Sequence, residues 1–383
     1  MDPYATRPTD AAISQPVGPP EPAPGAPFAV SRAATASASR TPAQSRSRHL
    51  WPAALTLFIL APVVGEMLSG STPPLLFINP ISLLFQTGLY GSGAILAREL
   101  VRRRGLGWPN IFVLGAAYGV LEEGLVVTSW FNPHWPDLGT LGSYGRALDV
   151  NLIWALGLTA YHAVVSIAIP IALTEAFFPA IASRPWLTRR AFWLFGFWLA
   201  VVSLLGLLGF GFLAFRKQGY THPPAAYLLA LALAVALVRF GLRWRPASDR
   251  RPAHRPTPRL WTVRLSALGM MVAFFATLWV FPVKISAAWI TGFAMVAVIT
   301  FAAWMTWRWS SRTGWSRQHR LALASGGLAF FLLLAPLLEL GAAAHGKPTQ
   351  GMILVASFFA ALLIVLARRQ GPDRARVTQS HAE

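Results

Sequence analysis

Two neighbouring glutamates and a histidine are the residues whose types and placement could do chemistry. Glu122 and Glu123 lie in the apolar stretch YGVLEEGLVVTSW, residues 118–130, and His162 lies in the apolar stretch LTAYHAVVS, residues 158–166. A carboxylate that accepts a proton, beside an imidazole, can activate water for attack on an acyl carbon. The same groups could carry protons in a transporter or form a structural hydrogen bond between helices. We take Glu122, Glu123 and His162 as candidate catalytic residues.

Four polar residues on or near the same stretches are expected to support these groups: Tyr118, Arg146, Asn151 and Ser166. Tyr118 and Ser166 each lie four residues from a candidate group and therefore share its helix face. Asn151 precedes His162 by about three helical turns, which returns it to the same face. Arg146 belongs to the connection between the two stretches and could fold back onto a glutamate.

Membrane helices must position these groups. The 383-residue chain is 55% hydrophobic and 12% charged, with a mean hydropathy of +0.49. Its apolar runs have the length, about 20 residues, that crosses a bilayer core, whereas a membrane barrel would show short alternating segments. The pattern predicts an all-α, polytopic membrane helix bundle of about ten transmembrane helices. The predicted spans are residues 49–69, 75–97, 108–130, 149–178, 191–215, 222–238, 260–282, 285–307, 321–341 and 349–367.

The net charge of +19 follows from topology and does not indicate a nucleic-acid partner. Of the 33 lysines and arginines, 27 lie in the two tails and in every second loop, and five lie in the remaining connections. This alternation is the positive-inside pattern. It predicts a multi-pass protein of the plasma membrane with both termini in the cytoplasm.

The polar residues of the predicted spans gather in the first half of the chain. We expect residues 49–178 to form a four-helix membrane core that holds the polar site, and residues 179–368 to form a six-helix scaffold with an Arg/Pro-rich cytoplasmic loop at 239–259. Residues 1–48, rich in Pro, Ala, Ser and Thr, are predicted to be a disordered cytoplasmic tail. Residues 369–383 form a second cytoplasmic tail.

Neither a metal nor an organic cofactor is expected. The chain has no cysteine, which excludes disulfides and thiolate ligands. A catalytic zinc site commonly has three protein ligands including histidine, and His162 is the only histidine well inside a predicted span. The expected partners are the lipid bilayer and a membrane-protein or peptide substrate, while the sequence leaves the oligomeric state open.

Helix geometry makes further predictions about where the acidic residues face. Successive residues of an α-helix point about 100° apart, so Glu122 and Glu123 should face separate neighbours. One glutamate should look toward His162, and the other should lie on a face whose glycines, four residues apart, admit a close helix. Glu99 and Glu175 lie beside arginines at cytoplasmic span ends and should be exposed or salt-bridged. The connection at 131–149, rich in Trp, Tyr, Pro and Gly, is either an interfacial belt or a lid over the site.

The stretches LEEGLVV, residues 121–127, and LTAYHAVVS resemble the CAAX-processing and bacteriocin-processing (CPBP) family of intramembrane endopeptidases. That family carries a glutamate pair in an EExxxR motif within one transmembrane helix and a histidine in an FxxxH motif in the next polar one. The resemblance implies that a glutamate-activated water, assisted by the histidine, cleaves a peptide bond inside the membrane. Glu122 and Glu123 match the pair, with Glu122 in the place of the catalytic base, and His162 matches the histidine.

Two positions depart from these motifs, because Val127 stands in the place of the arginine and Leu158 in the place of the phenylalanine. Either Arg146 supplies the missing charge or at least one glutamate is protonated. The family's later ligands would have to come from Glu339 or His345. The segments FNPHWPDLGTLGSYGR and YHAVVSIAIPI also resemble a signature of uncharacterised prokaryotic membrane proteins. A proton-coupled membrane transporter and a non-catalytic membrane scaffold stay open as alternatives to a hydrolase.

Overall fold

The computed structural model describes residues 50–214, 217, 224–245, 256–341 and 346–369. Every element described below belongs to the unit of residues 43–383. The predicted disordered tail, most of the predicted C-terminal tail and the middle of the Arg/Pro-rich loop lie outside the described residues. Apart from one short hairpin, the described chain is helical, which confirms the predicted all-α class.

The first half of the chain forms four helical segments that contain π-helical turns. The α-helices are α2 (Trp51–Pro62), α3 (Pro74–Phe77), α4 (Pro80–Gln86), α5 (Ser92–Arg103), α6 (Trp108–Gly119), α7 (Leu152–Tyr161) and α8 (Ile169–Phe177). The π-helical turns are η1 (Val63–Met67), η2 (Thr87–Gly91), η3 (Val120–Val126) and η5 (His162–Ala168). The short elements are the 3₁₀ turns η4 (Gly139–Gly142) and η6 (Pro179–Ile181) and the strands β1 (Arg146–Ala147) and β2 (Val150–Asn151).

The second half consists of longer and more regular helices. They are α9 (Arg189–Gly206), α11 (Pro224–Arg243), α12 (Leu260–Phe275), α13 (Phe281–Lys284), α14 (Ala288–Ser310), α15 (Arg317–Leu340) and α17 (Met352–Arg369). The π-helical turn η7 (Leu207–Ala214) extends α9, and η8 (Ala276–Val280) joins α12 to α13.

Seven helices of the described chain are long and apolar enough to cross a membrane, and they coincide with the last seven predicted spans. The first predicted span coincides with a shorter apolar helix over Trp51–Met67. The second and third coincide with the helices Pro80–Arg103 and Trp108–Val126, which carry ionisable groups and are not among the seven. The second begins later than predicted, because Pro80 fits the first helical turn and the Asn79 side chain accepts hydrogen bonds from the next backbone N–H groups.

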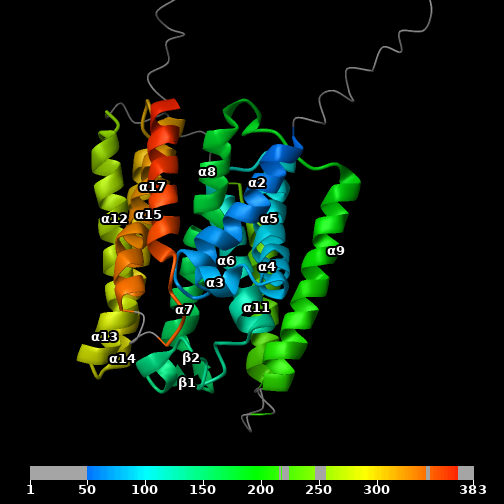
Figure 1. Ribbon diagram of the computed structural model, residues 1–383, viewed down its shortest axis with the longest axis vertical. Coiled ribbons are helices and arrows are strands. Elements are labelled where there is room, and N and C mark those ends of the chain that lie inside the picture. Colours follow the sequence, from blue (N-terminus) through cyan, green and yellow to red (C-terminus); the bar gives the residue numbers. More distant parts are fainter. Residues whose placement is uncertain (1–49, 215–216, 218–223, 246–255, 342–345, 370–383) are drawn as a thin grey trace, which may run out of the picture. The chain divides into compact units, whose positions relative to one another are not determined.

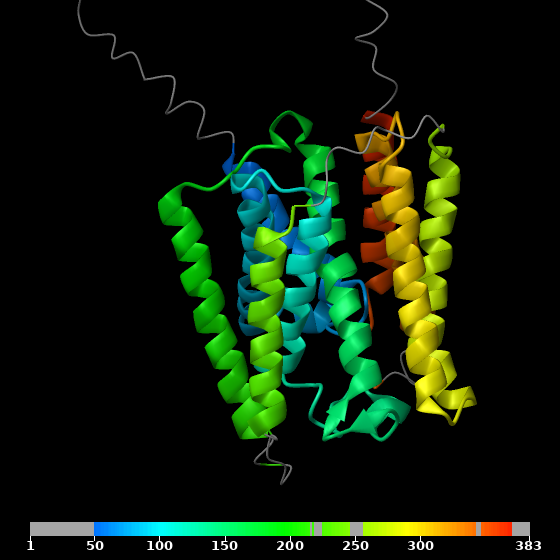
Figure 2. The same cartoon turned by 180° about the vertical axis from the view of Figure 1, so that it is seen from behind.

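The polar first half lies between helices that present apolar side chains outward. In Figure 1, α9 stands on one side of α2, α5 and α8, while α12, α15 and α17 gather on the other, and Figure 2 shows the same grouping from behind. The most apolar window of the helix over Leu152–Phe177 is 61% buried, whereas the corresponding windows of α9, α11 and α14 are each 17% buried. The segment α7–η5–α8 is therefore an inner element, and α9, α11 and α14 have the exposed apolar faces that lipid would cover.

Prolines flank two of the π-helical turns in the first half. Pro62 directly precedes η1, and Pro170 is the second residue after η5. Proline cannot donate the regular helical hydrogen bond to the residue four positions earlier and crowds that carbonyl. It therefore favours local rewinding of the helix where it occurs. Because π-helical turns are frequent at functional sites, their side chains are candidates for a functional site.

The connection at 131–149 is a compact segment that is tied to several helices. It contains η4 and β1, and β1 forms a hairpin with β2 directly after the segment: Arg146 pairs with Asn151 and Ala147 with Val150. The Tyr144 hydroxyl lies 2.7 Å from the Thr291 hydroxyl on α14. Asp137 forms an ion pair of 2.5 Å with the ammonium of Lys347, which lies in the segment before α17.

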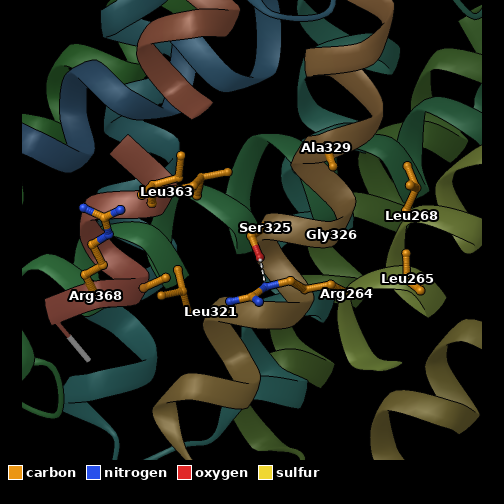
Figure 3. Close-up of a pocket in the computed structure, with 11 residues that line it drawn as sticks. Arg264, Leu265, Leu268, Leu321, Ser325, Gly326, Ala329, Leu363 and Arg368 are labelled. Atoms are coloured by element: carbon orange, nitrogen blue, oxygen red, sulfur yellow. Dashed lines mark hydrogen bonds between the residues drawn. The ribbon is translucent and has the colours of Figure 1, made fainter. Parts of the chain in front are cut away.

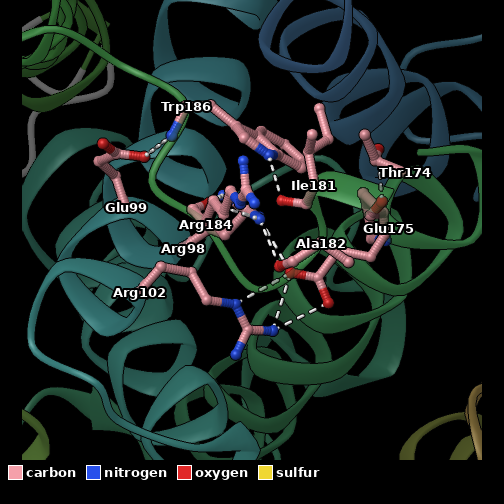
Figure 4. A network of polar contacts seen from close by, with 10 residues as sticks. Arg98, Glu99, Arg102, Thr174, Glu175, Ile181, Ala182, Arg184 and Trp186 are labelled. Atoms are coloured by element: carbon pink, nitrogen blue, oxygen red, sulfur yellow. Dashed lines mark hydrogen bonds and ion pairs between the residues drawn. The ribbon is translucent and has the colours of Figure 1, made fainter. Parts of the chain in front are cut away.

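At the end of the bundle that carries the described chain termini, a buried ion-pair network joins α5 to α8 (Figure 4). Arg98 Nε and Arg102 Nη2 lie 3.0 and 2.8 Å from Glu175 Oε1. The Arg98 guanidinium stacks on the Trp186 ring at 3.2 Å and donates to backbone carbonyls of the following loop. Glu99 accepts from Arg103 and from two backbone N–H groups. Glu99 and Glu175 were predicted to be exposed or salt-bridged. Both are salt-bridged, and both are buried.

Candidate functional site

The four π-helical turns of the first half carry the ionisable and polar side chains of the site. Glu66 lies in η1, Tyr90 in η2, the glutamate pair in η3, and His162 and Ser166 in η5. Turn η1 contacts η5 directly, and η3 contacts α7, the helix that η5 continues. The rewound parts of separate helices therefore meet in one place, and each contributes polar groups to it.

His162 lies between the two glutamates. Its Nε2 is 3.0 Å from Glu123 Oε1, and its Nδ1 is 3.2 Å from Glu122 Oε2. Nδ1 also makes a 3.0 Å hydrogen bond with the Ser166 hydroxyl one turn along η5. The side chains of all three ionisable groups are less than 10% exposed. The sequence-predicted meeting of a glutamate with His162 is confirmed.

The prediction that Glu122 and Glu123 face separate neighbours is wrong. Both carboxylates reach the ring of His162. The prediction assumed an α-helix, but η3 is π-helical and places more residues in each turn. Successive side chains are therefore closer in direction, and an imidazole has a nitrogen on each side of its ring to meet two acids.

The two glutamates differ in how far their oxygens are committed. Glu123 Oε2 accepts a hydrogen bond from the Ser129 hydroxyl, and Ser129 in turn accepts from Trp154 Nε1 at 2.9 Å. Glu122 Oε2 is buried and makes no hydrogen bond of good geometry within the described chain. Tyr118 lies next to Glu122, but its hydroxyl also falls outside hydrogen-bond geometry. Both oxygens of Glu123 are thus hydrogen-bonded, whereas Glu122 Oε2 has, among the described residues, only the 3.2 Å ion-pair contact with His162 Nδ1 and is the oxygen better placed to accept a proton.

A strained backbone residue brings Ser129 back to Glu123. Thr128 follows η3 with a φ of 57°, a left-handed conformation that is rare for a β-branched residue. Such residues persist where the surroundings hold them, and they cluster at functional sites. Thr128 and Ser129 are completely buried. The sequence analysis missed Ser129 and Trp154, because no helical period links Ser129 to Glu123 once the helix has ended.

A second carboxylate cluster adjoins the first. Tyr90 donates a 2.5 Å hydrogen bond to Glu66 Oε1, and Thr72 donates one of 2.8 Å to Glu66 Oε2. The rings of three tyrosines surround the imidazole of His162, with centroids 5.2 to 6.0 Å away; they are Tyr90, Tyr118 and Tyr161. Glu66 and Tyr90 are among the polar residues of the first half, but the sequence alone did not assign them to the site.

Two of the predicted supporting residues lie elsewhere. Asn151 caps α7 by accepting from Trp154 N at 2.9 Å and donates to the Leu141 carbonyl. The helix begins one residue after Asn151, so the periodicity that aligned it with His162 does not apply. Arg146 donates to the carbonyls of Phe131 and Asp149 and does not supply the charge that the motif lacks at position 127.

The glycine face of α6 packs directly on η5, as predicted. A Cβ on Gly115 would lie 2.8 Å from Ala163 Cα, and one on Gly119 would lie 3.0 Å from His162 Cβ. The two glycines therefore allow the helix of the glutamates to approach the helix of the histidine. The other face-sharing prediction, Ser166 beside His162, is also confirmed.

Replacing Gly115 by valine is expected to lower the free energy of unfolding by about 1–3 kcal/mol, because added methyl groups must separate two closely packed backbones. Unfolding in mixed SDS micelles, followed by tryptophan fluorescence, measures this loss. Gly196→Val is the matched control, since a Cβ there meets nothing within 4 Å. Equal losses in both variants would contradict the packing argument.

The same three groups are the candidate ligands for a cation. Glu122, Glu123 and His162 each offer one ligand atom, and in the described chain these atoms lie within 4.8 Å of one another. Two carboxylates and an imidazole suit several divalent metals. However, each ring nitrogen of His162 already faces a carboxylate oxygen, so one ion could bind all three groups only after that ring had turned. The present arrangement fits proton exchange better than metal ligation.

Comparison with known proteins adds one finding. A model of an uncharacterised membrane protein family matches residues 55–308, which is most of the chain. The chain belongs to this family. No curated protein and no solved structure matches it. The family match confirms the membrane character of the chain and, in part, its resemblance to uncharacterised membrane proteins. It does not show the CPBP resemblance.

The family match covers all four π-helical turns of the site and ends within α14. The glutamate–histidine cluster therefore lies within the matched region, whereas α15 and α17 lie beyond it. The region also contains the Arg98–Glu175 network.

Proposed function

We propose that the protein is an intramembrane hydrolase that cleaves a peptide bond with a glutamate-activated water. The observation that carries this proposal is the asymmetry of the glutamate pair about His162. Both oxygens of Glu123 are hydrogen-bonded, by Ser129 and His162, while Glu122 Oε2 lies 3.2 Å from His162 Nδ1 without a hydrogen bond of good geometry in the described part of the chain. A general base needs a free oxygen and a neighbour that stays in place.

In the proposed reaction, Glu122 takes a proton from water as the water oxygen bonds to the peptide carbonyl carbon. The resulting tetrahedral intermediate collapses when the carbon–nitrogen bond breaks, and the proton passes to the leaving nitrogen. His162 assists by holding the Glu122 carboxylate, which lies 3.2 Å from its Nδ1, while Glu123 and Ser166 fix the orientation of its ring. Each bond that forms or breaks is thus matched by one proton transfer, and no further reactant is needed.

The resemblance to the CPBP endopeptidases supports a peptide as the substrate. In that family the first glutamate of the pair is the base, and here the first, Glu122, is the one with an oxygen that makes no hydrogen bond to the described residues. Of the two possible stand-ins for the family's later ligands, Glu339 instead accepts from the Ile353 N–H on α17. His345 lies outside the described residues.

Substrate trapping tests the proposal. We expect the purified full-length Glu122→Gln variant to retain peptides that the wild-type protein releases, because binding persists while proton transfer stops. Mass spectrometry of the bound peptides measures this and identifies the substrate. Glu339→Gln is the matched control, since it removes a membrane glutamate outside the cluster. An unaltered peptide profile in Glu122→Gln would count against hydrolysis.

Proton-coupled transport is the second candidate. An observation that favours transport is the adjoining cluster, which extends the polar region along the bundle and consists of Glu66, Tyr90 and Thr72. Toward the ion-pair network, however, the helix from His162 to Glu175 buries Ile167, Ile169 and Ile171. This apolar stretch interrupts a proton path on that helix, so we rank transport below hydrolysis. A non-catalytic scaffold ranks third, because the described contacts of the glutamates are to side chains of other helices and not only to backbone groups.

We also propose ten membrane crossings in the plasma membrane, with both termini in the cytoplasm. The start of α2 and the end of α17 lie at the same end of the bundle, and the hairpin lies at the other (Figure 1). Both this arrangement and the alternation of basic loops support the orientation. A cysteine-free chain allows a direct test with single introduced cysteines.

We expect Ser143→Cys to react with a membrane-impermeant maleimide in intact cells, and Thr313→Cys to react only after permeabilisation. Ser143 lies between η4 and β1, and Thr313 lies in the turn between α14 and α15. Both positions are exposed in the structure, so burial does not limit labelling. The reverse labelling pattern would invert the proposed topology.

A further inference from the structure

A cavity of about 520 Å³ opens between α12, α15 and α17, away from the glutamate–histidine cluster. Figure 3 shows the three helices around it, with α15 between the other two. Most of its wall is aliphatic and comes from Leu265, Leu268, Leu321, Ala329, Leu363 and Ile364. Leu265 and Ile364 are more than half exposed, so the cavity opens to the outside of the bundle, where the membrane lies.

Two arginines add positive charge to this apolar wall. Arg264 reaches across from α12 toward α15, where its Nε donates to the Ser325 hydroxyl at 3.3 Å, and Arg368 comes from α17 (Figure 3). None of the ion pairs found in the described chain involves either guanidinium. Most guanidinium N–H groups are thus available to an anion, and phosphate is the anion whose geometry they match.

The depth of the two arginines fits the polar boundary of a membrane. Arg264 is the fifth residue of α12, and Arg368 is the last but one of α17. The helix start and the helix end lie at the same end of the bundle (Figure 1). From there the aliphatic wall continues into the span toward Leu268 and Ala329. The charges near the surface suit a phospholipid headgroup, and the apolar wall below them suits its acyl chains.

We propose that this cavity binds one anionic glycerophospholipid. Its phosphate lies between Arg264 and Arg368 near the Ser325 hydroxyl, and an acyl chain lies along the aliphatic wall of α12, α15 and α17. Basic pockets between transmembrane helices on the cytoplasmic side are known to hold acidic headgroups. A free phosphate would leave the aliphatic wall without a partner, and a neutral lipid would leave the two charges without one.

Lipid binding to the purified full-length protein in a non-ionic detergent tests this proposal. Native mass spectrometry would compare phosphatidylglycerol with phosphatidylcholine of the same acyl chains. We expect wild-type protein to prefer phosphatidylglycerol. We expect Arg264→Gln and Arg368→Gln each to weaken its binding about fivefold, and the double variant about 25-fold, from the usual contribution of one basic residue near acidic lipid. Arg243→Gln is the matched control, since Arg243 ends α11 outside the cavity.

Two further measurements separate charge from shape. The lysine variants of both arginines should retain the preference for phosphatidylglycerol. Ala329→Phe should fill the apolar part and weaken binding of the lipid without changing its charge, and it carries the test if the glutamine variants do not fold. The proposal is overturned if wild-type protein binds both lipids equally, if Arg243→Gln loses as much as the double variant, or if inorganic phosphate binds as tightly as the lipid.

Discussion

The Glu122→Gln variant is expected to cleave the trapped peptide about 100- to 10,000-fold more slowly than the wild-type protein, which is the usual contribution of a general base. Glutamine preserves the shape of the side chain but cannot take a proton from water. The loss should appear in kcat, with KM little changed, because the step that fails follows binding. Cleavage of a synthetic copy of the trapped peptide in proteoliposomes measures both constants.

Variants of the other cluster residues should rank below Glu122→Gln in effect. Ser129→Ala removes the hydrogen bond that holds Glu123 and should slow cleavage about tenfold, as expected for a group that only positions another. Glu339→Gln should cleave at the wild-type rate. Wild-type kcat in Glu122→Gln would refute the assignment of the base. Chelators should leave the rate unchanged, since the proposed step needs no metal.

The sequence predicted the helices and the meeting of acid with histidine, because both depend on short-range patterns. Apolar runs of about 20 residues specify membrane helices whatever the packing. The cost of burying Glu122 and Glu123 in hydrocarbon required a polar partner, and His162 was the only histidine at a suitable depth. These predictions needed no knowledge of how individual turns are wound.

The details that the sequence did not predict depend on departures from the regular α-helix. The π-helical winding of η3 lets both glutamates reach His162, whereas α-helical geometry separates them. The left-handed backbone of Thr128 returns Ser129 to Glu123. Both features depend on tertiary contacts, and the types of the residues involved do not predict them. The prediction for Asn151 was wrong for a different reason. It assumed that Asn151 belongs to the helix of His162, but Asn151 is the N-cap and lies outside the helical period.

The Arg98–Glu175 network carries the second large prediction. Replacing Glu175 by glutamine is expected to lower the free energy of unfolding by about 3–5 kcal/mol, the usual cost of leaving a buried charge without its partner. Arg98 is 1% exposed, and Arg102, the other partner of Glu175, is also mostly buried. Asp137→Asn is the matched control. It breaks a partly exposed ion pair with Lys347 and should cost less than about 1 kcal/mol.

A double-mutant cycle separates the loss of the ion pair from the loss of a carboxylate. Arg98→Met alone should also destabilise, since Glu175 then keeps only Arg102. In the Arg98→Met/Glu175→Gln double variant the second change should cost less than it does alone, because only Arg102 and no longer the fully buried Arg98 then loses its partner. SDS-induced unfolding of the four proteins measures the coupling. Additive losses would mean that α5 and α8 are held together by packing, with Arg98 stabilised by Trp186 and the loop carbonyls and not by Glu175.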